Sequence, residues 1–335
     1  MEKSLRGLAM MVLLMVATGS DFRGAGVAAQ FTGPTLACGG TSLLKTTTLI
    51  TPALVSTNCV YKIRAINLRV CQLRLDFNSF NLIGPSITPS VPYPHCSSDV
   101  LSVENLDFTL CGENSGQHLY VPFTPSVTDL TFTIEFKLAP SAARQSTPYW
   151  NIRVQQLECP VGASFASKAA FRAELPPLVK TFHNDLGVLA PTGCLQYHTA
   201  SNGIIKSFNF DNGGPYPANL NYAICFRRGR ESEGLRLHAS VFDLGFGSAD
   251  GYDGACFANI ATPGRSEDYL YIPNAVAGND PQQLVRATRF CSKSIHQKTV
   301  EATPPGPYVL QFNSDSIYGA NGATETGFQI TYEII

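Results

Sequence analysis

Ten cysteines behind a short apolar N-terminal run constrain this chain more than any other feature of its sequence. The 335 residues hold an even number of cysteines, and an even number behind a secretion signal is typical of a disulfide framework. No Cys-x-x-Cys spacing occurs, which disfavours a zinc site. Counting alone does not choose the pairs. The cysteines are Cys38, Cys59, Cys71, Cys96, Cys111, Cys159, Cys194, Cys225, Cys256 and Cys291.

The first residues have the layout of a secretory signal peptide. A positively charged start precedes an apolar run over residues 8–17, which is too short to span a bilayer. Cleavage is expected after Gly19, so that residues 1–19 are removed, and a second candidate site ends at Ala29. An uncleaved anchor is the alternative. We expect a secreted, extracellular product without a transmembrane span.

Alternation of apolar and polar residues predicts an all-β fold. Residues 73–77, 130–138 and 235–241 alternate with period two, which places one face on a core and the other toward solvent. Only 15% of residues are charged and 44% are hydrophobic, which excludes a disordered chain or a coiled coil. An Ala-rich stretch at 163–182 is the exception and suggests one short helix in a linker over 161–190.

An internal similarity points to two units. A cysteine pair, a turn-rich stretch and a closing strand occur in each half of the chain, which suggests a duplicated four-cysteine unit. We therefore expect two antiparallel β-sandwich domains in tandem, at residues 30–160 and 191–335.

The second unit is where a family resemblance becomes visible. Residues 203–210 (GIIKSFNF), 268–272 (DYLYI), 312–315 (FNSD) and 327–332 (GFQITY) resemble the motifs of CUB domains. The first unit matches more loosely, through sequences such as Leu110-Cys111-Gly112. Together the motifs resemble a secreted, CUB-containing branch that is common in arthropods. The resemblance implies a jelly-roll-like sandwich in each unit.

The resemblance also implies a disulfide pairing. In the family, the first cysteine of a domain joins the second and the third joins the fourth. Cys71 and Cys159 are left over by that pattern, and their pairing follows only by elimination. The pairs implied are Cys38–Cys59, Cys96–Cys111, Cys194–Cys225 and Cys256–Cys291, with Cys71–Cys159 as the fifth.

The sequence offers little catalytic chemistry. Ser115 and His95 superficially resemble protease motifs, but the neighbouring Cys111 and Cys96 are better explained as a disulfide. No H-E-x-x-H, P-loop or G-x-S-x-G occurs, and the six histidines are scattered. A net charge of −1 argues against a nucleic-acid partner. We predict that the protein is not an enzyme.

Calcium is the one cofactor that the resemblance raises. Calcium-binding CUB domains use an early Glu, the Asp of the D-Y-L strand and the Asp of F-x-S-D. Asp268 and Asp315 match the last two positions. The early position falls near Gly245 and is not matched, and Asp250 and Asp253 are the alternatives for it. In the first unit only Asp99 matches. No cofactor is required by this interpretation, and calcium in the second unit stays an open alternative to turn stabilisation by the two aspartates.

Three functions fit these observations. The favoured one is a secreted, non-catalytic binding or adhesion protein that holds a protein or glycan partner through CUB loops. The alternatives are a structural component of the extracellular matrix and a regulatory accessory protein of an extracellular protease cascade.

Overall fold

Strands make up nearly all regular structure in the part of the chain that the computed structural model describes. Those parts are residues 34–55, 57–141, 146–160, 185–245, 251–256, 267–318 and 324–335. The 3-10 turns η3 (Phe210–Asn212) and η4 (Asp253–Cys256) accompany the strands. The predicted all-β class is confirmed. The expected signal peptide at 1–19 and the helix expected within 163–182 lie outside the described residues.

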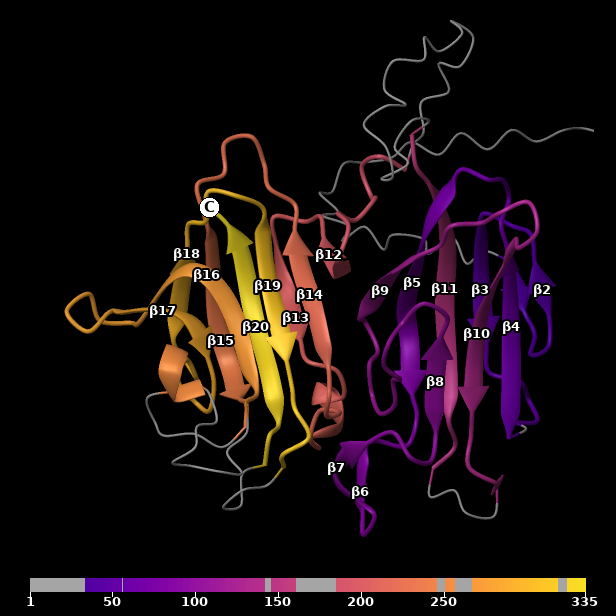
Figure 1. Cartoon of the computed structure of the whole chain (residues 1–335), viewed down its shortest axis with the longest axis horizontal. Coiled ribbons are helices and arrows are strands. Elements are labelled where there is room, and N and C mark those ends of the chain that lie inside the picture. Colours follow the sequence, from indigo (N-terminus) through magenta and orange to yellow (C-terminus); the bar gives the residue numbers. More distant parts are fainter. Residues whose placement is uncertain are drawn as a thin grey trace, which may run out of the picture. The chain divides into compact units, whose positions relative to one another are not determined.

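The first half of the chain forms two sheets, of five and four strands (Figure 1). The first has the order β1 (Thr35–Leu36), β3 (Thr46–Ile50), β11 (Tyr149–Glu158), β5 (Val70–Asn81) and β9 (His118–Pro122). The second has the order β2 (Thr41–Ser42), β4 (Asn58–Arg64), β10 (Thr131–Lys137) and β8 (Val100–Val103). A separate hairpin joins β6 (Ser86–Thr88) to β7 (Val91–His95). The ladders are antiparallel except for the edge pairs β1–β3 and β2–β4.

The alternation along β10 shows why these residues form a sandwich. Phe132, Ile134 and Phe136 are buried, and the residues between them are half-buried. Phe136 stacks on Trp150 of the other sheet with 4.0 Å between ring centroids. The Trp150 indole donates a hydrogen bond to the Tyr61 hydroxyl at 3.0 Å, which in turn donates to the Ile50 carbonyl at 2.6 Å. Two sheets therefore share one core, and the polar atoms of Trp150 and Tyr61 within it are hydrogen-bonded.

The second half is also built of antiparallel strands (Figure 1). Its order is β12 (Cys194–His198), β14 (Asn221–Phe226), β19 (Tyr308–Asn313), β16 (Tyr269–Ala277), β18 (Thr299–Ala302), β15 (Leu235–Asp243), β20 (Gly327–Ile334) and β13 (Asn202–Lys206), and β17 (Val285–Phe290) pairs with β16. Among the described strand pairs of this half, only β12 and β14 are parallel.

One strand connects the two ladders of this half. The start of β16 pairs with β19 and its end pairs with β18. Between the two ladders Asn274 has φ 51°, a left-handed conformation that Asn tolerates better than most residues. Phe312 of β19 and Phe328 of β20 meet edge-to-face at 5.5 Å, so the two ladders enclose a common core.

Five disulfide bonds link the strands and the loops beside them. Cys38–Cys59 and Cys96–Cys111 lie in the first half, and Cys194–Cys225 and Cys256–Cys291 lie in the second. Cys71–Cys159 joins β5 to the residue after β11 and closes the longest loop, with a separation of 88 residues. The structure thus places together the same cysteines that the resemblance and the elimination pair, and each bridge restricts the unfolded chain.

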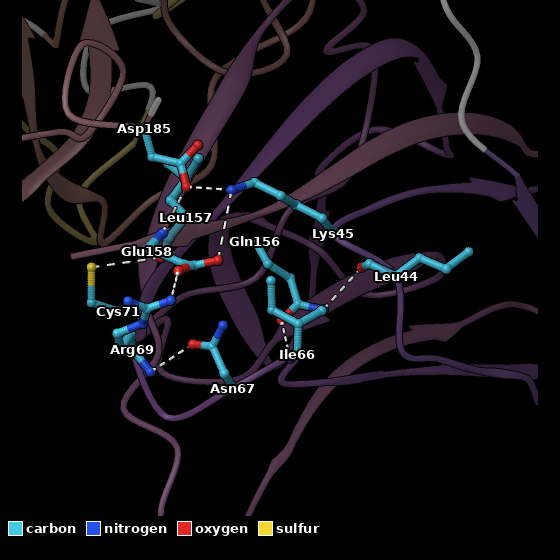
Figure 2. A network of polar contacts seen from close by, with 10 residues as sticks. All are labelled: Leu44, Lys45, Ile66, Asn67, Arg69, Cys71, Gln156, Leu157, Glu158 and Asp185. Carbon is cyan, nitrogen blue, oxygen red and sulfur yellow. Dashed lines mark hydrogen bonds and ion pairs between the residues drawn. The ribbon is translucent and has the colours of Figure 1, made fainter. Parts of the chain in front are cut away.

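Residues 185–190, the described end of the expected linker, are docked on the first half. Lys45 Nζ donates to Asp185 Oδ2 at 2.6 Å, and the Glu158 amide donates to the same oxygen at 3.1 Å (Figure 2). The Gln72 side chain exchanges two hydrogen bonds with the Ala190 backbone, at 2.8 and 3.0 Å. The Val188 and Leu189 amides both donate to Asp185 O, at 2.8 and 2.9 Å, and residues 185–188 form a turn.

A second cation completes the contact in Figure 2. Arg69 lies 3.2 Å from Glu158, whose other oxygen is 3.8 Å from Lys45. Asp185 and Glu158 are both buried, so the two basic side chains balance two carboxylates that are largely removed from water.

Candidate functional site

The two aspartates of the calcium hypothesis lie together at one end of the second half. Asp268 precedes β16 and Asp315 follows β19, and these strands pair. The Asp315 amide donates to Asp268 Oδ1 at 2.7 Å, and the Tyr216 hydroxyl donates to Asp268 Oδ2 at 2.5 Å. Both Asp315 oxygens accept backbone hydrogen bonds, from Glu267 and Ile317, each at 2.7 Å. All four oxygens therefore have donors from the protein itself.

The electrostatics of this cluster keep Tyr216 protonated. Burial raises the pKa of Tyr216 well above its ordinary value, and the carboxylates of Asp268 and Glu325 raise it further. Burial also raises the pKa of Asp315, and the hydrogen bonds from Glu267 and Ile317 offset part of that rise. A protonated phenol beside a carboxylate is a hydrogen-bond donor, so Tyr216 helps to fix Asp268 in place.

The described residues do not complete a calcium ligand set. The early position was expected near Gly245, whose amide donates to the Tyr216 hydroxyl at 3.0 Å. Asp253 lies in a different turn and accepts from the Thr288 and Arg289 amides. Asp250 lies outside the described residues. Among the residues that the structure describes, no three His, Cys, Asp or Glu side chains are grouped to hold a metal.

The remaining sequence candidates serve local structure. In the first half, Asp99 is buried and accepts backbone hydrogen bonds from Ile83 and Ala139. Ser115 Oγ accepts from the Phe80 amide at 2.9 Å. His95 Nδ1 is 3.1 Å from the carbonyl oxygen of Tyr93. Each of these side chains thus has a hydrogen-bond partner within the first half.

Sequence reasoning missed a polar contact between the two halves, which we call the joint. It consists of Asn114, Gln117 and His118 from the first half with Gln196, Tyr197, His198, Ser207 and Asn209 from the second. All of them belong to one compact unit, Thr32–Ile335.

Asparagines hold one side of the joint. The Asn209 amide donates to Asn114 Oδ1 at 2.9 Å, and the Glu113 amide donates to Asn209 Oδ1 at 3.2 Å. Gly112 has φ 76°, and a Cβ built on it would overlap the Asn209 side chain. Two reasons therefore favour glycine at position 112: its left-handed backbone conformation and the close approach of the Asn209 side chain.

Histidines hold the other side. The Tyr197 amide donates to His118 Nε2 at 3.0 Å, and the rings of His118 and His198 are 4.9 Å apart. Tyr120 and Tyr197 also meet edge-to-face at 6.1 Å. The residue pattern within one strand cannot predict such a contact, because the partners lie about 80 residues apart in the sequence.

Comparison with protein families assigns the second half. The family model for the animal CUB domain matches residues 191–335. The chain carries an animal CUB domain. Asp268, Asp315, Asn209 and Tyr197 all belong to this CUB domain.

Solved structures add distant likenesses. The CUB1-EGF-CUB2 domains of rat MASP-1 are 14% identical, and the alignment covers 90% of this chain and 100% of that one with a TM-score of 0.28. The same domains of human MASP-1/3 are also 14% identical, with coverage of 87% and 100% and a TM-score of 0.28. The extracellular region of zebrafish Gpr126/Adgrg6 is 9% identical, with coverage of 89% and 36% and a TM-score of 0.27. No curated protein matches the chain.

A cavity of about 400 Å³ lies where the CUB domain meets the first half. Its buried wall includes Tyr120, Leu195 and Tyr222, and exposed Asp107 lies at its edge. This volume is at the lower end of the range for small-ligand sites. Within the described parts of the chain, no helix is both long and apolar enough to cross a membrane.

Proposed function

We propose that this protein is a secreted, non-catalytic binding protein that holds an extracellular protein or glycan through the loops of its CUB domain. The observation that carries the proposal is the CUB family match over residues 191–335. CUB domains are extracellular protein-interaction modules, and five disulfides suit an oxidising compartment.

The first half is proposed to be a second, divergent CUB-like domain. Its support is a disulfide-bonded sandwich of two sheets, with Cys38–Cys59 and Cys96–Cys111 in the order that the second half also uses. The domain limits proposed are 30–160 and 191–335, with the intervening segment partly docked on the first half through Asp185.

The proposed binding surface is the loop end that carries Asp268 and Asp315. The loop after β19 is held by the hydrogen bond from the Asp315 amide to Asp268 and by the one from the Ile317 amide to Asp315, while Ser316 beside them is exposed. A rigid loop with an exposed tip suits recognition, because little conformational entropy is lost on binding. The surface works without a cofactor in this proposal.

The test uses affinity capture from the native extracellular fluid, with and without a chelator. A bulky Ser316→Trp variant should lose the partner that the wild-type chain retains. Gln282→Trp is the matched control, because Gln282 is also exposed but lies in the β16–β17 connection. Equal recovery by wild type and Ser316→Trp would remove these loops as the binding surface.

Two outcomes would favour the alternatives. A chain that is extracted only by a chaotrope would be a matrix component. A protease that copurifies in stoichiometric amount would indicate an accessory protein of a protease cascade. Labelling of Ser115 by a broad serine-hydrolase probe, abolished in Ser115→Ala, would contradict the non-catalytic assignment.

A further inference from the structure

Two histidines from opposite halves meet inside the joint. His118 lies on β9 and His198 lies on β12, and their rings are 4.9 Å apart in an edge-to-face arrangement. His118 is 8% exposed. The Nε2 atom of His198 is buried and has no hydrogen-bond partner within the described residues. His118 is therefore buried, His198 is half-buried with its Nε2 atom shielded from water, and the two rings are in contact.

The hydrogen bonding shows that His118 is neutral. Its Nε2 accepts a hydrogen bond from the Tyr197 amide at 3.0 Å, so the ring proton must sit on Nδ1. A proton added to Nε2 would point at the Tyr197 N–H and abolish this bond. A hydrogen bond between the two halves thus exists only while His118 is uncharged.

The surroundings offer no compensation for a new positive charge. Arg74 of β5 is already cationic and close to both rings, and it pairs with Asp76 at 2.7 Å. Asp76 is the residue opposite His118 in the β5–β9 ladder, so the carboxylate best placed to help is engaged by Arg74.

The other groups that face the pair are aromatic or basic. They are Tyr120, whose hydroxyl accepts from Arg74, Tyr197 beside Arg227, and Phe226 and Tyr332, which pack on the His198 ring. None of these residues supplies a negative charge near neutral pH.

Both imidazoles accordingly resist protonation in the closed joint. Burial, and then the charge of Arg74, lower the pKa of His118 to about 4. Burial, then His118, and then Arg74 lower the pKa of His198 to about 3. An exposed histidine titrates near 6.5, so the open state takes up protons at a higher pH than the closed state.

We propose that His118 and His198 form an acid-sensitive latch that holds the CUB domain against the first half at neutral pH and releases it in acid. The latch is additional to the proposed binding function, and its test does not depend on whether a binding partner is found. The direction of the pH effect follows from the linkage between protonation and opening. Because both histidines titrate lower when closed, their contribution is complete above pH 6.5 and is lost progressively as the pH falls below that value.

The size of the pH effect follows from the pKa values of His118 in the closed and in the open state. Between pH 7.5 and pH 5.0, the equilibrium constant for opening should rise about 30-fold through His118 alone. A similar factor is expected from His198 if both rings become exposed in the same opening.

Amide hydrogen exchange of the full oxidised chain tests the proposal, after correction for the intrinsic pH dependence of exchange. The amides of β12, above all that of Tyr197, should lose at least tenfold in protection at pH 5.0 relative to pH 7.5. The β14–β19 ladder, which contains no residue of the latch, should keep its protection. Unchanged protection of β12 in the wild-type chain would overturn the proposal.

Variants assign the effect to the histidines. His198→Phe keeps a ring against Phe226 and Tyr332 but cannot titrate, and His118→Gln removes the other imidazole. Each should reduce the pH response of β12. His238→Gln is the control, because His238 is an exposed histidine on β15 and its loss should leave the response intact. If His198→Phe fails to fold, His118→Gln decides alone, and a full response in a folded variant would overturn the latch.

Discussion

The contact between Gly112 and Asn209 permits a sharp test of the joint. In Gly112→Ala, the new Cβ would overlap the Asn209 amide group. The asparagine would have to move, and its side chain would then lose a hydrogen bond from the Glu113 amide and one to the Pro215 carbonyl.

Gly116 provides a matched control within the same loop. Its φ of 79° is close to the 76° of Gly112, but a Cβ on Gly116 meets nothing within 4 Å. Each alanine should cost about 1–2 kcal/mol for its left-handed backbone. Gly112→Ala should cost a further 1–3 kcal/mol, roughly, for the two hydrogen bonds of Asn209. The difference between the two variants therefore measures the cost of displacing the Asn209 side chain, whose hydrogen bond from the Glu113 amide crosses the joint.

The assay is urea unfolding of the oxidised full chain, followed by far-UV circular dichroism. The same comparison in an Asn209→Gly variant makes the test more specific. Asn209 has φ 64°, which glycine adopts freely, so Asn209→Gly removes the side chain without backbone strain. In that background the extra cost of Gly112→Ala should vanish. Equal destabilisation by Gly112→Ala and Gly116→Ala would refute the close approach of the two halves.

The remaining predictions concern thiols, modularity and metal. Thiol labelling of the denatured, unreduced chain should find no stoichiometric free cysteine, and two labelled thiols at Cys71 and Cys159 would remove that bridge. A fragment of residues 191–335, expressed in an oxidising compartment, should give dispersed amide NMR signals, since its strands pair within the fragment; a collapsed spectrum would mean that the halves depend on a shared core. The melting temperature should be the same in EDTA and in a few millimolar calcium, because the oxygens of Asp268 and Asp315 have protein donors. A calcium-dependent rise that Asp315→Ala abolishes would contradict that expectation.

Much of the fold was accessible from local pattern. The alternation over residues 130–138 predicted β10, and the alternation over 235–241 predicted part of β15. A period of two reports which face of a strand meets a core, and this information lies within a few neighbouring residues. The CUB resemblance of residues 203–210 and 327–332 was visible for the same reason and is confirmed by the family match.

The candidate site was accessible only in part. Sequence motifs suggested that Asp268 and Asp315 lie together as calcium ligands. In the structure the Asp315 amide donates a hydrogen bond to Asp268, so the two residues are in contact. The role of Tyr216 as donor to Asp268 was not visible, because it lies 52 residues away on a separate segment. Hydrogen-bond geometry, rather than residue type, determines what these carboxylates bind.

The sequence by itself determined the all-β class, the even number of cysteines and the CUB motifs of residues 191–335, since each is visible in composition or in short motifs. Only the tertiary structure decided the joint. His118 and His198 look like scattered surface histidines in the sequence, and their contact depends on which edges of two sandwiches meet. Burial and the nearby charge of Arg74 then set their titration. Both are properties of atoms gathered from distant parts of the chain, so no local pattern reports them.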